Sequence, residues 1–132
     1  MVLIHGLTAF MAYFISSVVF LVLFSIIYKW ITPYNEFKLI HEGNTAAALS
    51  FSGVLIGFVL PMASAIAHSA SLFDMFIWAG VALAVQVISF LAVRLVFPTL
   101  VNDISSNNVS TGLFLGVISI LTGILNAACI TS

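Results

Sequence analysis

The chain of 132 residues is apolar and almost uncharged, with 63% hydrophobic and 5% charged residues. Ordinary soluble domains carry about a quarter charged residues, so this composition excludes a soluble fold. Three Lys and Arg residues against four Asp and Glu give a net charge of -1, which leaves no basic surface for nucleic acid.

Four long apolar segments follow one another along the chain, and each approaches the length of about 20 residues that spans a bilayer. The first covers about residues 6–28 and lacks the preceding cationic stretch of a cleavable signal peptide. The second covers about 46–67, and the fourth about 109–130. The third lies between Asp74 and Arg94, twenty residues apart, a helical rise of about 30 Å. We therefore predict one all-α, polytopic membrane domain, residues 1–132, with four transmembrane helices.

The basic residues and two prolines gather in the first and third connections. Pro33 follows Lys29 by four residues, and Pro98 follows Arg94 by the same spacing, so each proline is expected to end a membrane helix. Lys38 lies in the first connection as well. The positive-inside rule predicts that both connections are cytoplasmic and that both termini lie outside, in the periplasm of a Gram-negative cell.

The two cytoplasmic connections are alike in sequence. Each proline is followed by a short amphipathic stretch and then by an asparagine, Asn44 or Asn108, which we predict to be a helix N-cap. The asparagines are 64 residues apart and the prolines 65. This offset predicts two tandem helical hairpins, about residues 1–67 and 68–132, which run parallel because each crosses the membrane twice.

Aromatic residues at the membrane boundary are predicted to be interfacial anchors, as rings with one polar edge favour that position. The candidates are Tyr28, Trp30 and Tyr34 at the inner boundary and Trp78 at the outer one.

Small residues recur at steps of three or four along the second and fourth helices, and each helix contains a GxxxG pair. Such stripes let membrane helices approach closely, either within one chain or between copies, and both alternatives stay open. Pro61 is expected to bend the second helix and to free a backbone carbonyl. The packing positions are Ser50, Gly53, Gly57, Pro61, Gly112, Gly116, Ser119 and Gly123.

Gln86 is the one strongly polar side chain near the middle of a predicted membrane helix, and Thr122 and Asn126 add polar groups to the fourth helix. These side chains either make hydrogen bonds between helices or line a polar path. His5, His68 and Asp74 are expected at one rim, but their spacing fixes no coordination geometry, so we predict no metal site and no cofactor. Because no charged residue is expected in the hydrocarbon core, we predict neither an enzyme nor a proton-driven transporter.

Three segments resemble the YjfL-like family of small bacterial inner-membrane proteins. The resemblance implies a bacterial inner-membrane location and a duplicated two-helix domain of unknown function, and it supplies no catalytic residue. Some relatives in that family are encoded near genes for ATP-grasp, glutathionylspermidine-synthetase-like enzymes, so the resemblance also implies a role in envelope stress or polyamine physiology. The segments are Asn44-Thr-Ala-Ala-Ala-Leu-Ser-Phe-Ser-Gly53 with Gly57 and Pro61, Gly123-Ile-Leu-Asn126-Ala-Ala-Cys129, and Ile31-Thr-Pro33-Tyr-Asn-Glu36.

Two functions fit the sequence. The first is a non-enzymatic homo-oligomer that acts as a channel or transport-like component, with the polar residues above and Ser119 as candidates for its wall. The second is a structural or interaction subunit that anchors a larger assembly of membrane or envelope proteins in the lipid bilayer. Its cytoplasmic contacts would be Phe37, Ile40 and Ile104.

Overall fold

The computed structural model describes residues 2–32 and 34–130, and every element in that part of the chain is helical. Four long helices are long and apolar enough to cross a membrane, which confirms the predicted all-α membrane fold. The helices α1 and α4 extend beyond their predicted limits by several residues. The long helices are α1 (Val2–Ile31), α3 (Thr45–His68), α4 (Leu72–Val96) and α6 (Val109–Ile130), and the short helices are α2 (Glu36–His41) and α5 (Leu100–Ser105).

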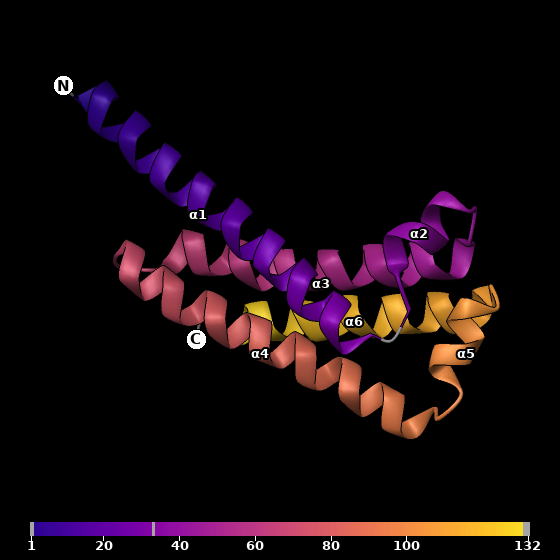
Figure 1. The fold of residues 1–132 in the computed structure, drawn as a ribbon. Coiled ribbons are helices and arrows are strands. Elements are labelled where there is room, and N and C mark those ends of the chain that lie inside the picture. Colours follow the sequence, from indigo (N-terminus) through magenta and orange to yellow (C-terminus); the bar gives the residue numbers. More distant parts are fainter. Residues whose placement is uncertain (1, 33, 131–132) are drawn as a thin grey trace.

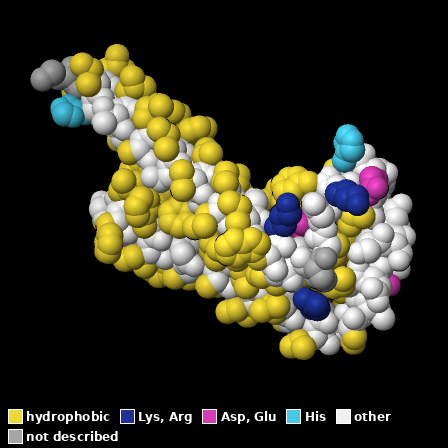
Figure 2. Space-filling view, viewed as in Figure 1, with side chains coloured by type: hydrophobic (Ala, Val, Ile, Leu, Met, Phe, Trp, Pro, Cys, Tyr) yellow, Lys and Arg dark blue, Asp and Glu magenta, His cyan; other side chains and the backbone are white. Residues whose placement is uncertain are grey.

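The two ends of the bundle differ (Figure 1): we call the end where α1 diverges from the other long helices the open end, and the opposite end, which carries the short helices α2 and α5, the closed end. α3 and α6 lie side by side, and α4 packs against both of them. α1 approaches the bundle only near its C-terminal end and diverges from it toward its N-terminal end. The short helices α2 and α5 lie together at the closed end, where the lysine and arginine side chains also gather (Figure 2).

The contact between α3 and α6 brings backbone against backbone. Gly53 faces the backbone of Gly116, and a Cβ atom placed on Gly123 would collide with the carbonyl oxygen of Gly57. Gly112 faces the backbone of Ala46 in the same way. Residue numbers rise together on both helices, so α3 and α6 run in the same direction. The predicted stripes of small residues thus meet inside one chain, where missing side chains permit this approach.

A group of aromatic rings holds the C-terminal half of α1 against the bundle. Phe24 stacks on Phe58 with ring centroids 4.6 Å apart. Tyr28 contacts Phe51 at 5.8 Å and packs edge-on against Phe90 at 5.0 Å. Aromatic pairs in such geometries add to the energy of burial. α1 is therefore fixed to α3 and α4 at one end only.

The three residues predicted to be inner-boundary anchors occupy different environments. Trp30 is 80% exposed and fits an interfacial position. Tyr28 is 1% exposed and Tyr34 9% exposed, so the prediction is wrong for these two residues. Their rings are covered because α1 folds its last turns onto α3 and α4 and the chain then turns back toward α2.

The turns after α2 and α5 have the same hydrogen-bond pattern. Gly43 and Asn107, which are 64 positions apart, adopt positive φ values of 87° and 62°. The next residue in each turn, Asn44 or Asn108, donates its backbone N–H to a carbonyl five residues earlier at 2.8 Å. This pattern resembles the turn that commonly ends helices with a left-handed residue. It supports the predicted duplication into tandem hairpins, which itself remains a prediction.

The α3–α6 contact predicts a large difference between two glycine substitutions. Gly123→Ala should lower the free energy of unfolding by about 1–3 kcal/mol, because the new methyl group meets the Gly57 carbonyl and the helices must separate. Gly80→Ala is the matched control, since Gly80 lies in α4 with nothing within 4 Å of the added methyl group. Reversible unfolding in mixed micelles measures both, and equal stability of the two variants would contradict this account of the contact.

Candidate functional site

A hydrogen-bonded junction lies in the middle of the bundle, where Pro61, Gly57 and Gln86 meet. Proline has no backbone N–H, so Pro61 leaves the carbonyl of Gly57, four residues earlier, without its helical donor. Gln86 of α4 replaces that donor, because its Nε2 donates to the Gly57 oxygen at 2.9 Å. The same nitrogen donates to the carbonyl oxygen of Ser119 on α6 at 3.1 Å. One carboxamide therefore joins three membrane helices.

The Gln86 side chain is 2% exposed and lies within the junction rather than on the outer surface. Both Nε2 hydrogens have acceptors, whereas Oε1 has no partner among the described residues. The two serines of the predicted packing stripe are also buried, and Ser50 donates its hydroxyl to the carbonyl of Ala47 at 3.1 Å. Of the polar residues predicted to pack or to line a path, Ser50, Gln86 and Ser119 are thus part of the interior.

Thr122 and Asn126 lie farther along α6, toward the open end of the bundle. Thr122 donates its hydroxyl proton to the carbonyl of Ile118 at 2.9 Å, so the hydroxyl of Ser89, 3.2 Å away, is the donor in their pair. Asn126 is 8% exposed, and its Nδ2 has no partner among the described residues. An unpaired amide donor at such a buried position is unusual and calls for an explanation.

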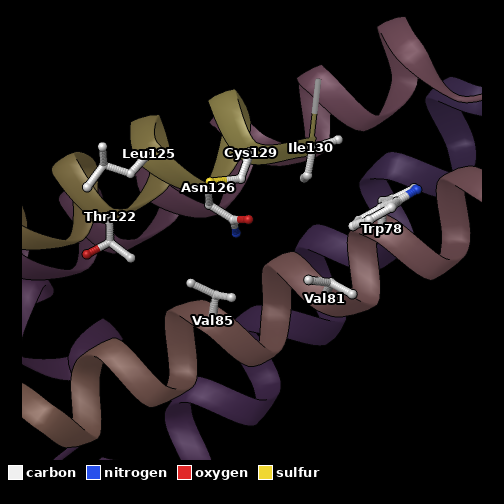
Figure 3. A pocket seen from close by; sticks show the side chains of 8 residues that line it. All are labelled: Trp78, Val81, Val85, Thr122, Leu125, Asn126, Cys129 and Ile130. Atoms are coloured by element: carbon white, nitrogen blue, oxygen red, sulfur yellow. The ribbon is translucent and has the colours of Figure 1, made fainter. Parts of the chain in front are cut away.

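Asn126 borders a hollow of about 420 Å³ that lies between α4 and α6 (Figure 3). In Figure 3 its amide points across the gap toward α4, from which Val81 and Val85 extend, while Trp78 lies at one end of the hollow and Thr122 at the other. The hollow is lined by Trp78, Val81, Val85, Thr122, Leu125, Asn126, Cys129 and Ile130.

The two predicted N-cap asparagines both face the first turn of a helix. Asn44 Oδ1 accepts from the backbone N–H of Ala47 at 2.8 Å, and Asn108 Oδ1 accepts from that of Thr111 at 3.4 Å. Asn44 also donates from Nδ2 to the carbonyl of Ile104 at 2.9 Å, which ties α3 to α5. Ile104 is fully buried, so the expectation that it offers an apolar contact to a partner is wrong.

The basic residues of the boundary lie at the closed end, as the sequence indicated. Lys29 Nζ lies 5.8 Å from the ring centroid of Phe37, and Lys38 is exposed on α2. Arg94 Nη1 donates to the carbonyl of Ile31 at 3.5 Å, the outer limit of a hydrogen bond. These contacts connect the end of α1 with α2 and α4.

The two prolines predicted to end membrane helices differ in what the structure describes. Pro98 is exposed and follows Phe97, the C-cap residue of α4. Pro33 lies outside the described residues. Of the predicted boundary set, the structure therefore places Lys29, Lys38, Arg94 and Pro98 at the closed end.

A buried polar cluster at the closed end escaped the sequence analysis. Glu36, the first residue of α2, is 1% exposed, and Thr32 donates its hydroxyl to Glu36 Oε1. The hydroxyls of Tyr28 and Tyr34 and the second oxygen of Glu36 are buried without partners among the described residues. The Thr32 and Glu36 pair, four residues apart around a proline, was the available signal. The sequence predicts only a short amphipathic stretch here, which by itself gives no sign that Glu36 is buried.

Burial controls the electrostatics of this cluster. Burial raises the pKa of Glu36, and the Thr32 hydrogen bond and the Lys29 charge oppose that rise only in part. Burial and the Glu36 carboxylate likewise raise the pKa of Tyr34. The raised pKa extends the pH range over which the Glu36 carboxyl group keeps its proton. No group of three or more His, Cys, Asp or Glu in the described part of the chain could hold a metal ion.

Comparison with known proteins identifies relatives over almost the whole chain. Residues 1–130 match the family described as Domain of Unknown Function (DUF350). The chain is 44% identical over 129 residues to the UPF0719 inner membrane protein YjfL of Escherichia coli strain K12, covering 98% of both chains. It is 28% identical over 111 residues to the UPF0719 transmembrane protein YshE of Bacillus subtilis strain 168, covering 83% of both. No solved structure matches it.

The junction of Pro61, Gly57 and Gln86 predicts that a second substitution reduces the loss of stability caused by replacing Gln86. Gln86→Leu should destabilise the fold by about 1–2 kcal/mol, because the Gly57 carbonyl loses its donor inside the membrane. Pro61→Ala restores a helical N–H to that carbonyl, so Gln86→Leu should cost less in the Pro61→Ala chain. A double-mutant cycle of unfolding free energies measures the coupling, and any packing defect from Pro61→Ala cancels in it. Strictly additive effects would refute the junction.

The burial of Glu36 predicts that the stability of the fold depends on pH and that Glu36→Gln removes this part of the dependence. Because the folded-state pKa is raised, the stabilisation linked to the neutral carboxyl is complete below the usual pKa of 4.5 and is lost as the pH rises through the folded-state value. Gln mimics the neutral acid at every pH. The stability of Glu36→Gln relative to the unmodified chain should therefore increase with pH across that window, as thermal unfolding in detergent can measure. Parallel pH profiles of the two chains would exclude a buried, neutral Glu36.

Proposed function

The chain belongs to the DUF350 family, and on that premise we propose that it works as a non-enzymatic homo-oligomer whose copies enclose a transport-like path through the bacterial cell membrane. The α3–α6 pair is the rigid core of each copy. α1 provides the contact with a neighbouring copy. The path runs between copies, and its wall includes polar side chains near the open end of the bundle.

The divergence of α1 from its own bundle carries this proposal. Of its 30 residues, only Phe24 and Tyr28 are buried. One face of its N-terminal half borders a hollow of about 380 Å³ that opens toward Ile66 of α3. That face combines the small residues Gly6, Ala9 and Ser17 with aromatic rings, and small residues let another helix approach closely. The hollow is lined on α1 by Gly6, Ala9, Phe10, Tyr13, Phe14 and Ser17.

The tight interior of a single copy supports a path between copies. Backbone contact between α3 and α6 leaves no room for a solute along their shared axis. Gln86 and Ser119 are 2% and 1% exposed and already take part in the central junction. Thr122 and Asn126, which border a hollow open to the surface, are therefore the better candidates for the wall.

The direction of insertion follows from the basic residues. Lys29, Lys38 and Arg94 all lie at the closed end with α2 and α5. By the positive-inside rule this end faces the cytoplasm, and the start of α1 and the end of α6 face outward. The printed names of the relatives, an inner membrane protein and a transmembrane protein, support a place in the bacterial inner membrane.

A second candidate is a subunit that anchors a larger membrane or envelope assembly and acts in envelope stress. Phe37 on α2 is 55% exposed and Trp30 at the end of α1 is 80% exposed, so both could bind a partner near the cytoplasmic boundary. Ile40 is half-buried and Ile104 is fully buried, which leaves this surface smaller than the sequence indicated. We therefore rank it second.

The oligomer predicts that a bulky residue in the α1 face lowers assembly and flux together. Ala9→Trp should abolish most self-association, because its indole fills the space that a neighbouring helix needs, and ion or small-solute flux in liposomes should fall about tenfold or more. Ile15→Trp is the matched control, since Ile15 is 52% exposed and lies outside this lining. Native mass measurements and flux against empty liposomes report the two effects.

Each outcome bears on one part of the proposal. Monomers at high protein density would overturn the homo-oligomer. Oligomers in liposomes that stay sealed over a range of salts and potentials would overturn the path. Sealed liposomes together with a stoichiometric second protein in material purified from membranes would favour the anchoring role.

A further inference from the structure

The hollow between α4 and α6 has the chemistry of a site for a neutral, largely apolar ligand. The eight described residues that line it include no carboxylate, amine or guanidinium group. Its floor is formed mainly by aliphatic side chains from both helices. A charged headgroup would find no counter-charge there, whereas a hydrocarbon chain would meet surfaces like itself.

Asn126 gives this apolar hollow one specific polar requirement. The Thr122 hydroxyl already donates within its helix and accepts from Ser89, so it has little to offer a ligand. Asn126 Nδ2 is buried, has no partner among the described residues, and points into the gap (Figure 3). A ligand that brings a hydrogen-bond acceptor would therefore satisfy this donor.

The depth of Asn126 in the membrane indicates which neutral hydrogen-bond acceptors can reach it. Asn126 lies four residues before Ile130, the last residue of α6, which places it about 6 Å inside the helix end. Trp78, at the same end of the hollow, is a residue type favoured at the membrane interface. The interfacial layer between headgroups and hydrocarbon is the depth at which the carbonyls of ester-linked lipids lie. Below it, Val85 lies seven residues from Trp78, a rise of about 10 Å that suits a length of acyl chain.

The hollow is also accessible from the side. Leu125 is 68% exposed and Val81 is 39% exposed, so the lining continues onto the surface that faces lipid. We propose that an ester-linked membrane lipid occupies this hollow, with one acyl chain between α4 and α6 and its ester carbonyl accepting a hydrogen bond from Asn126 Nδ2. The site lies away from the α1 face of the proposed oligomer but shares Thr122 and Asn126 with the proposed wall of the path, and its test uses lipid quenching, which does not require flux.

Fluorescence of Trp78 can test this site, because Trp78 and Trp30 are the only two tryptophans. In a Trp30→Phe chain, phosphatidylcholine with brominated acyl chains should quench Trp78. Unbrominated ester-linked phosphatidylcholine should relieve the quenching about threefold to tenfold more effectively than its ether-linked analogue, the ratio expected for one hydrogen bond inside a membrane protein. The ether analogue has the same headgroup and chains but lacks the carbonyl.

Two variants identify the donor. Asn126→Leu should bring the ester-to-ether ratio to about one, while Thr122→Val should leave it unchanged. An equal effect of both lipids in the Trp30→Phe chain would overturn the proposal by itself, without any Asn126 variant. Loss of the ratio in Thr122→Val would also overturn it. If Trp78 fluorescence is quenched only at low protein density, a second copy of the chain covers the hollow in place of a lipid, and the proposal is overturned.

Discussion

Two membrane helices gain little from apolar burial, since lipid chains are as apolar as leucine, so close packing and hydrogen bonds must hold them together. α3 and α6 meet this requirement by placing glycines where their backbones touch. Their approach brings the carbonyls of Gly57 and Ser119 within reach of one side chain, Gln86. α4 is fixed by that contact, and the aromatic rings of α1 then pack against α3 and α4. The positions of α4 and α1 therefore depend on the contact between α3 and α6.

The two ends of the bundle have different properties. At the closed end, Asn44 ties α3 to α5, Arg94 reaches α1, and Glu36 is buried beside Thr32. At the open end, α1 diverges, and the hollow beside Asn126 lies between α4 and α6. Features proposed to bind a neighbouring copy or a lipid thus lie at the open end, and the closed end keeps the helices in register. A fixed base and a less constrained rim suit a membrane protein that must hold its shape while contacts with its surroundings change.

The sequence predicts the four membrane helices well, because length and apolar composition determine them almost alone. Helix ends are predicted less well, since α1 begins at Val2 and continues to Ile31, beyond the expected limits of about residues 6 and 28. The small-residue stripes are visible in sequence, but their partner depends on which helices become neighbours. Pro61 does identify Gly57 as a carbonyl without a donor, yet the choice of Gln86 requires the register of α4. Glu36 was missed because an acidic residue in a connection is usually solvated, and only the packing around Tyr28 and Tyr34 buries it.

The Gln86 junction has a consequence for how the chain is made. Its carboxamide needs one acceptor from α3 and one from α6, and α6 leaves the ribosome and enters the membrane after α3 and α4. Until then, α4 resides in the bilayer with a polar group only partly satisfied, in contact with α3, the insertion machinery or water. Assembly of the bundle is therefore coupled to the insertion of α6. A chain cut short before Ser119 would present an incomplete junction, a defect that membrane quality control could detect.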